Sequence, residues 1–261
     1  MEPIQIVLLF ALGLLAGVSG GLLGIGGGLI MVPVLVMMFS TDSHPDAVVH
    51  LAVATSLATV VVTGISSALA HQRRQSVEWS SVLRLAPGLM LGAVLAGLFG
   101  ALIPGRLLAI VFGIFALLMA LRLALRSAPG AINRPLPGWF FAPAGVGIGG
   151  LSALVGIGGG SLVVPLLAAT GRRMQLAVGS ASACGVPLAL AGTVGWAWPG
   201  WQAVQDNALG YVVLPAAALM SLGALLGAPL GARLAHWVAP IVLQRGFAVF
   251  LSVLGAYMLV F

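Results

Sequence analysis

The groups in this sequence that could bind a ligand are main-chain groups in two glycine-rich runs. Residues 21–33 read GLLGIGGGLIMVP, and residues 153–165 read ALVGIGGGSLVVP. Glycine lets the backbone leave helical geometry and lets a ligand approach the main chain closely. A helix that begins directly after such a run points its unpaired N–H groups, and the positive end of its dipole, at whatever lies in front of it. The runs therefore predict an anion site with the candidate residues Gly24, Gly26, Gly27, Gly28, Gly156, Gly158, Gly159, Gly160 and Ser161.

Hydroxyl residues follow each glycine run at matching positions. HLAVATSLA at residues 50–58 corresponds to QLAVGSASA at residues 175–183, so Thr55, Ser56 and Ser180 are candidate donors to an oxyanion. Two alternatives stay open. The hydroxyls could bond to carbonyls of their own helix, and the glycines could serve close helix packing, because Gly20, Gly24 and Gly28 are spaced four residues apart.

Other kinds of site find little support. The chain has eleven arginines and no lysine, and the centres of its apolar segments contain no Asp or Glu, which a cation site inside a membrane would be expected to show. Cys184 is the only cysteine, and the four histidines lack metal-site spacing. We therefore expect no catalytic residue, cofactor or metal and no enzyme activity. His50 opens the segment that carries Thr55 and is a candidate proton carrier.

The elements that position these residues are predicted to be membrane helices. The chain of 261 residues is 61% hydrophobic and only 6% charged, more apolar than one soluble core could use. An all-α polytopic membrane protein is expected. The second and seventh of its apolar segments are too short to span about 30 Å of hydrocarbon. The predicted segments are 4–22, 29–39, 46–70, 81–103, 106–125, 138–155, 160–170, 175–197, 208–234 and 240–260.

The arginines predict an orientation. Each short segment and the segment before it could form two full membrane crossings, or a hairpin that re-enters on the same side. Both arrangements return the chain to the face of the membrane where the pair began. Ten of the eleven arginines then lie on one side, with only Arg106 on the other. By the positive-inside rule that side is cytoplasmic and both termini are periplasmic. Tryptophans fall at segment ends, where an aromatic belt is expected: Trp79, Trp139, Trp196, Trp198, Trp201 and Trp237.

The similarity of the two glycine runs predicts an internal duplication. Eight of their thirteen positions are identical, and the similarity continues into the following segment. We divide the chain into a first transmembrane repeat (1–126), a cytoplasmic linker (127–137) and a second repeat (138–261). A repeat with an odd number of passages inverts the second copy. The expected architecture is two inverted repeats of about five helical segments each, whose glycine-broken half-helices or re-entrant hairpins meet near mid-membrane.

The doubled glycine runs, the AVATS and AVGSA helices behind them and RRQSVEW at residues 73–79 resemble the TauE/SafE family of sulfite exporters. The resemblance covers nearly the whole chain. It implies transport of sulfite, organosulfonates or related small sulfur and organic anions across a bacterial inner membrane. The second copy departs from the family pattern, with GSAS at 179–182 where a TS pair is more typical.

These observations together predict an exporter of small anions that works by alternating access. An anion leaving a cell that is negative inside runs downhill by about 2.3 kcal/mol per charge for each 100 mV, so export needs no coupled ion. An anion channel with the same site, or a carrier of another small carboxylate, are the alternatives. The expected partners are the anion and the lipid bilayer, not nucleic acid. The identity of the anion, proton coupling and a homodimer stay open.

Overall fold

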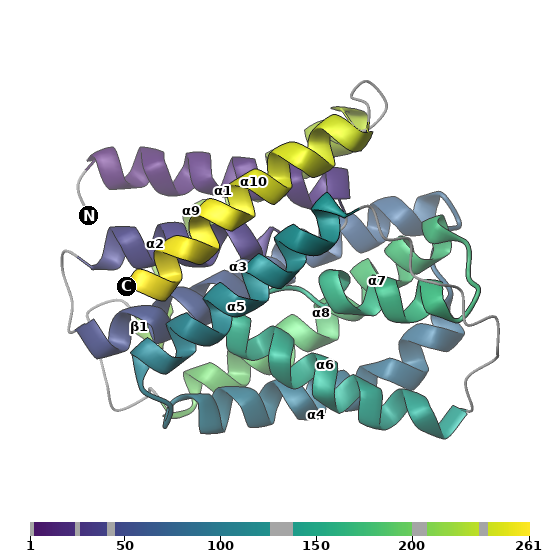
Figure 1. The fold of residues 1–261 in the computed structure, drawn as a ribbon, viewed down its shortest axis with the longest axis horizontal. Coiled ribbons are helices and arrows are strands. Elements are labelled where there is room, and N and C mark those ends of the chain that lie inside the picture. Colours follow the sequence, from purple (N-terminus) through teal and green to yellow (C-terminus); the bar gives the residue numbers. More distant parts are fainter. Residues whose placement is uncertain (1–2, 24–26, 41–44, 126–137, 200–207, 235–239) are drawn as a thin grey trace.

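The computed structural model describes residues 3–23, 27–40, 45–125, 138–199, 208–234 and 240–261. Its elements are almost all helices (Figure 1). In chain order they are α1 Pro3–Leu23, α2 Gly28–Phe39, α3 Pro45–Arg73, α4 Trp79–Gly100, α5 Gly105–Ala124, the 3-10 helix η1 Gly138–Phe140, α6 Phe141–Val155, α7 Gly160–Ala169, α8 Met174–Ala197, β1 Ala208–Leu209, β2 Val212–Val213, α9 Leu214–Leu234 and α10 Pro240–Val260.

The predicted apolar segments correspond to these helices. Within the described residues, seven helices are long and apolar enough to cross a membrane. α2 has 12 residues and α7 has 10, so at 1.5 Å per residue they are about 18 Å and 15 Å long. The prediction of two half-length helices is confirmed.

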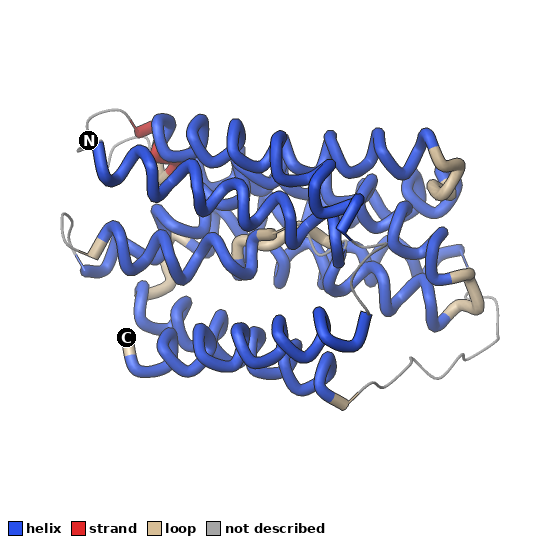
Figure 2. The backbone as a smooth tube through the Cα atoms, turned by 90° about the horizontal axis from the view of Figure 1, so that it is seen from above, coloured by secondary structure: helices blue, strands red, loops and turns tan. Residues whose placement is uncertain are grey.

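The two short helices turn back inside the bundle. α2 runs toward the end of the molecule at which α1 begins, and α7 runs toward the opposite end, at which α6 begins (Figures 1 and 2). The first residues of α2 and α7 lie between the helices rather than at either end of the bundle (Figure 2). Of the two arrangements that the sequence left open, the structure has the re-entrant one.

Helices from the first half of the chain pack in pairs with helices from the second half. α1 lies along α9, and α6 lies along α4, while α3 and α8 pack on each other in the centre and α5 packs on α10. Small residues permit the closest approaches: a Cβ atom on Gly227 would lie 2.2 Å from the Leu14 carbonyl oxygen, and one on Gly92 would lie 2.1 Å from that of Val146. Close packing through glycine is typical of membrane helices.

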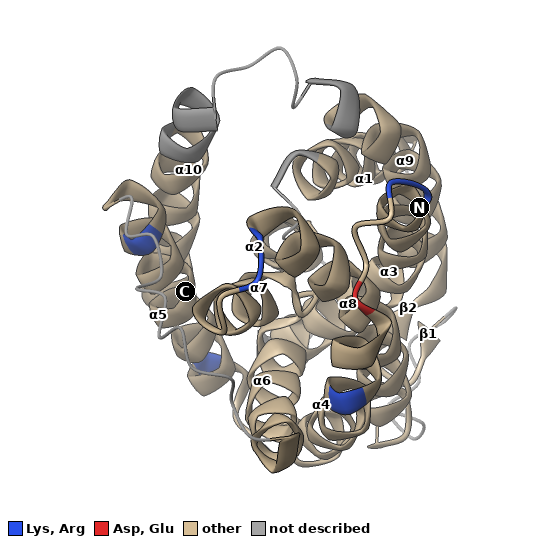
Figure 3. Cartoon of the chain, turned by 90° about the vertical axis from the view of Figure 1, so that its right-hand side faces the viewer, with Lys and Arg blue, Asp and Glu red and all other residues tan. Residues whose placement is uncertain are grey.

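The arginine-bearing loops that follow α3 and precede α8 lie at one end of the molecule, the end that faces the viewer in Figure 3. The first residues of α1 and the last residues of α10 lie together at the opposite end (Figure 1). The two ends of the bundle therefore differ in charge.

The structure corrects two expectations. The segment 208–234 is not one helix, because Gly210, with φ +61°, turns the chain between β1 and β2 and α9 begins only at Leu214. Trp196 is not in an interfacial belt: it is fully buried against Gly100, and its Nε1 donates to the Ala153 carbonyl at 3.1 Å. Trp79, Trp139 and Trp198 are at least half exposed. Trp201 and Trp237 lie outside the described residues.

Candidate functional site

The two glycine loops touch each other in the interior. A Cβ atom on Gly28 would lie 2.4 Å from the carbonyl oxygen of Gly156 and 2.9 Å from the Cα of Ile157. Gly27 and Gly156 have φ values of +71° and +72°, which side chains disfavour. These positions therefore require glycine both for conformation and for contact. Gly24 and Gly26 lie outside the described residues.

No side chain caps the N-terminus of either short helix. The first hydrogen bonds of α2 run from Ile30 and Met31 to the Gly27 carbonyl, and those of α7 run from Leu162 and Val163 to the Gly159 carbonyl. The N–H groups of the residues in front, Gly160 and Ser161 in α7, take no part in the helical hydrogen bonds. Both residues are buried. Buried main-chain donors at a helix N-terminus suit an anion.

A narrow cavity adjoins the second glycine loop. The centre of a water-sized sphere can move through about 20 Å³ of it, roughly the room for one water. None of the described residues that line it is charged. Small and hydroxyl residues make up most of the lining, among them Gly17, Gly20 and Gly21 of α1, Gly158, Gly159 and Gly160, Thr63 and Ser67 of α3, and Ser182 and Gly185 of α8.

The structure separates the hydroxyls that the sequence grouped together. Ser56 reaches the glycine loops, where its Oγ donates to the Gly156 carbonyl at 2.8 Å. Thr55 Oγ1 instead accepts from the Val213 N–H at 3.0 Å, just before α9. Ser180 Oγ accepts from the Glu78 N–H at 2.8 Å, just before α4. Thr55 of α3 and Ser180 of α8 therefore play equivalent parts: each accepts a hydrogen bond from the residue that precedes a long helix, α9 or α4.

Most other hydroxyls near the centre bond to their own helices. Thr59, Thr63 and Ser182 each donate to the carbonyl four residues earlier, at 3.0 to 3.3 Å. Ser152 and Ser161, by contrast, are buried and their hydroxyls have no hydrogen-bond partner in the described structure. A buried polar group without a partner calls for an explanation, and a role in binding a ligand is one.

His50 lies near the other end of the bundle, away from the glycine loops. It is 5% exposed, its Nε2 lies 3.0 Å from the Ile103 carbonyl oxygen, and its ring stacks on Tyr211 with centroids 5.3 Å apart. Trp196 meets the same ring edge-on at 5.6 Å. His50 and Tyr211 also line a second pocket beside the turn between α4 and α5, with about 400 Å³ of room.

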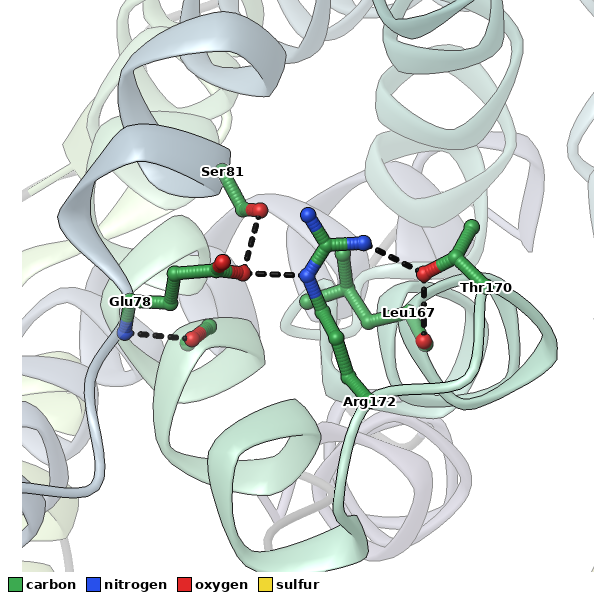
Figure 4. A network of polar contacts seen from close by, with 6 residues as sticks. Glu78, Ser81, Leu167, Thr170 and Arg172 are labelled. Carbon is green, nitrogen blue, oxygen red and sulfur yellow. Dashed lines mark hydrogen bonds and ion pairs between the residues drawn. The ribbon is translucent and has the colours of Figure 1, made fainter. Parts of the chain in front are cut away.

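An ionic network at the arginine-rich end ties the two halves together (Figure 4). Arg172 Nε donates to Glu78 Oε2, and Ser81 Oγ donates to the same oxygen at 2.6 Å. Arg172 also donates to Thr170 Oγ1 at 2.5 Å. The sequence reasoning missed this network, because nothing in the chain marks Glu78 and Arg172, 94 residues apart, as a pair.

The network sets the charge state of Glu78. Partial burial alone raises the pKa of this carboxyl group, but hydrogen bonds from Ser81 and Arg172 and the positive charges of Arg172 and Arg84 outweigh it. The pKa of Glu78 therefore lies below its ordinary value of 4.5. Glu78 is a carboxylate at neutral pH.

The sequence is similar to one known protein family and to several individual proteins. The family model described as sulfite exporter TauE/SafE matches residues 9–258. A probable membrane transporter protein of Haemophilus influenzae is 34% identical over 257 residues, 97% of each chain. One of Methanocaldococcus jannaschii is 30% identical over 97% of this chain and 94% of its own. The probable membrane transporter protein YunE of Bacillus subtilis is 35% identical over 62% of this chain and 66% of its own. No solved structure matches.

Proposed function

The chain belongs to the sulfite exporter TauE/SafE family of membrane transporters, and we propose that it exports sulfite, an organosulfonate or a related small anion by alternating access. The family is one of transporters and not of enzymes. The substrate, the binding site and the direction of transport are parts of the proposal.

The observation that carries the proposal is the contact of the two glycine loops beside an uncharged cavity. The loops meet at Gly28 and Gly156, and glycines of the second loop and hydroxyl residues line the cavity without a charged side chain among the described residues. Neutral N–H groups can hold an anion without a salt bridge, so its release breaks no ion pair. A site for a cation would need carboxylates at this depth.

The exchanged packing of helices supports alternating access. Residues 21–33 in the first half match residues 153–165 in the second. In the same relation α1 corresponds to α6 and α9 to α4, so the pairs α1–α9 and α6–α4 are equivalent. An inverted repeat produces this pairing, and it lets one bundle rock against the other around a central site.

The cavity beside Gly159 and the pocket beside His50 also fit alternating access. The cavity beside Gly159 lies against the half of α3 that leads to Arg73, and the pocket beside His50 lies at the other end of α3. The buried ring of Trp196 contacts His50 on one side and donates to the Ala153 carbonyl, just before the second glycine loop, on the other. Rocking that widens one space while closing the other would pass an anion across without opening a continuous pore.

We assign the arginine-rich end to the cytoplasm, which puts both termini in the periplasm. Described arginines at that end include Arg73, Arg74, Arg172 and Arg173. Short cytoplasmic loops carry such an excess of arginine in bacterial inner-membrane proteins.

Purified protein in liposomes tests the proposal directly. We expect sulfite or methanesulfonate to cross electrogenically, at carrier turnover, and Gly159→Leu to abolish the flux because the side chain fills the cavity. Gly147→Leu is the matched control, since a Cβ atom at Gly147 meets nothing within 4 Å. Normal flux in Gly159→Leu, or no flux of any small anion in the wild type, rejects the proposal. Flux far above carrier turnover favours the channel alternative.

His50 is proposed as the proton carrier only if transport is coupled to protons. Uniport is the simpler mechanism, and position 175, which corresponds to His50 in the second half, is glutamine. We therefore expect His50→Gln to keep anion flux driven by membrane potential and a pH gradient alone to drive none. Anion accumulation driven by a pH gradient in the wild type, and lost in His50→Gln, would contradict uniport.

A further inference from the structure

We propose that the anion is held by the second glycine loop alone, with Ser161 as the donor that determines specificity, and that the first loop is a structural support. This inference rests on the proposed function and narrows its site. It depends on differences between equivalent positions of the two halves.

The equivalent glycines have different surroundings. A Cβ atom on Gly27 would lie 2.6 Å from the Ala16 carbonyl oxygen, so backbone packs directly against this position. At Gly159, which corresponds to Gly27, the nearest atoms are side-chain methyls of Leu188 and Val163 at 3.3 Å and 3.4 Å. Position 27 therefore meets backbone that cannot move aside, whereas position 159 meets only side-chain methyls, which can.

Two positions near the second loop carry hydroxyls where the corresponding positions near the first loop are apolar. Ser161 corresponds to Leu29, and Ser182 corresponds to Leu57. Both leucines are buried in the apolar core, at 1% and 0% exposure. At these two positions the helices that follow the first glycine run carry buried leucines, and the helices that follow the second run carry hydroxyls.

Ser161 is the buried hydroxyl beside the second loop that has no partner; it directly follows Gly160, which lines the cavity, and is not itself a lining residue. It is 8% exposed and its Oγ has no hydrogen-bond partner in the described structure, whereas the Thr63 and Ser182 hydroxyls already bond to their own helices. Its own N–H and that of Gly160 are further donors at the same helix end. Donors clustered over two residues suit a compact oxyanion with several oxygens on one atom, such as sulfite or a sulfonate head group.

The cavity sets a limit on size. It has room for about one water, which is less than sulfite needs, so its walls must separate to load the anion. Glycines on three sides, at Gly20, Gly159 and Gly185, leave that space unfilled by side chains. A methyl group at Gly159 should therefore discriminate against the larger anion.

Anion binding to the purified full-length protein, measured by titration calorimetry with sulfite and methanesulfonate, tests the inference. We expect Ser161→Ala to weaken binding by roughly tenfold to a hundredfold, the usual effect of losing a hydrogen bond to a charged group. Ser161→Thr keeps the hydroxyl and should bind more tightly than Ser161→Ala. Gly159→Ala should weaken binding of methanesulfonate more than that of sulfite.

Matched variants separate binding from folding. Ser152→Ala removes another buried hydroxyl without a partner, and Leu29→Met changes the first loop at the position of Ser161. Both should bind as the wild type does. Wild-type binding by Ser161→Ala, or equal losses in Ser161→Ala and Ser152→Ala, overturns the inference while leaving the proposed function intact. A wild type that binds neither anion defeats the proposed function instead.

Discussion

Thr55 and Ser180 each hold the beginning of a helix rather than facing the cavity. Thr55 is fully buried, and its oxygen accepts the Val213 N–H. We expect Thr55→Val to leave that N–H unpaired and to lower the free energy of unfolding by about 1–3 kcal/mol. Thr55→Ser keeps the hydroxyl and should recover most of the loss. Thermal unfolding in detergent measures both variants.

A transport assay distinguishes this positioning role of Thr55 from a role in ligand binding. If Thr55 only positions α9, Thr55→Ser should carry sulfite with an unchanged KM. A KM that rises in Thr55→Ser while the unfolding temperature stays constant would show that Thr55 contacts the anion.

The sequence could place these hydroxyls but could not choose their partners. The match of Thr55 with Ser180 follows from the repeated segments, and both residues do lie at equivalent points of α3 and α8. Their acceptor role depends on the path of the chain more than 100 residues away, at Val213 and Glu78. Sequence spacing carries no information about such a bond.

At the scale of elements, glycine contacts control how closely the long helices pack. A Cβ atom on Gly227 would lie 2.2 Å from the Leu14 carbonyl oxygen, a contact that backbone cannot relieve without moving α1 from α9. We expect Gly227→Ala to lower the free energy of unfolding by about 1–3 kcal/mol. Gly147→Ala, which meets nothing within 4 Å, should be neutral or slightly stabilising. Equal stability of the two variants would contradict the packing.

The link between α4 and the loop before α8 has a pH dependence that follows from Glu78. Because the pKa of Glu78 in the folded protein lies below its ordinary value of 4.5, the stabilisation is present above pH 4.5 and is lost as the pH falls through the lowered pKa. We expect the unfolding temperature to drop below pH 4.5. In Glu78→Gln this drop should be smaller, and the protein should be less stable at pH 7. An unchanged acid profile in Glu78→Gln would contradict the network.

Element boundaries were predictable where composition alone determines them. The short helices α2 and α7 lie where the apolar segments 29–39 and 160–170 were predicted. The beginning of α9 was not predictable, because Ala208–Val213 is apolar enough to continue a helix and only the φ of Gly210 turns it into a hairpin. Hydropathy does not distinguish an apolar turn from an apolar helix.

For the whole molecule, the similarity of the two glycine runs and the placement of the arginines were readable in the sequence, whereas the different surroundings of the two runs were not. The two glycine runs share eight of thirteen residues, and their equivalence predicts two equal loops. Packing makes them unequal, because Gly27 meets backbone and Gly159 meets only side-chain methyls. That difference depends on neighbours from α1 and α8, which the local motif does not specify.

The proposed orientation of the whole molecule rests on its arginines and can be tested with introduced cysteines, because the chain has only one cysteine of its own to remove. In a Cys184→Ala background, Leu102→Cys, where Leu102 is 79% exposed between α4 and α5, and Arg74→Cys report on opposite ends of the bundle. The positive-inside rule puts Arg74 in the cytoplasm. A membrane-impermeant maleimide added to intact bacteria should therefore label Leu102→Cys, and should label Arg74→Cys only after the membrane is opened. The reverse pattern would contradict the positive-inside assignment and would place the cavity beside Gly159 toward the periplasm, but an anion would still run outward because the membrane potential sets the direction of uniport.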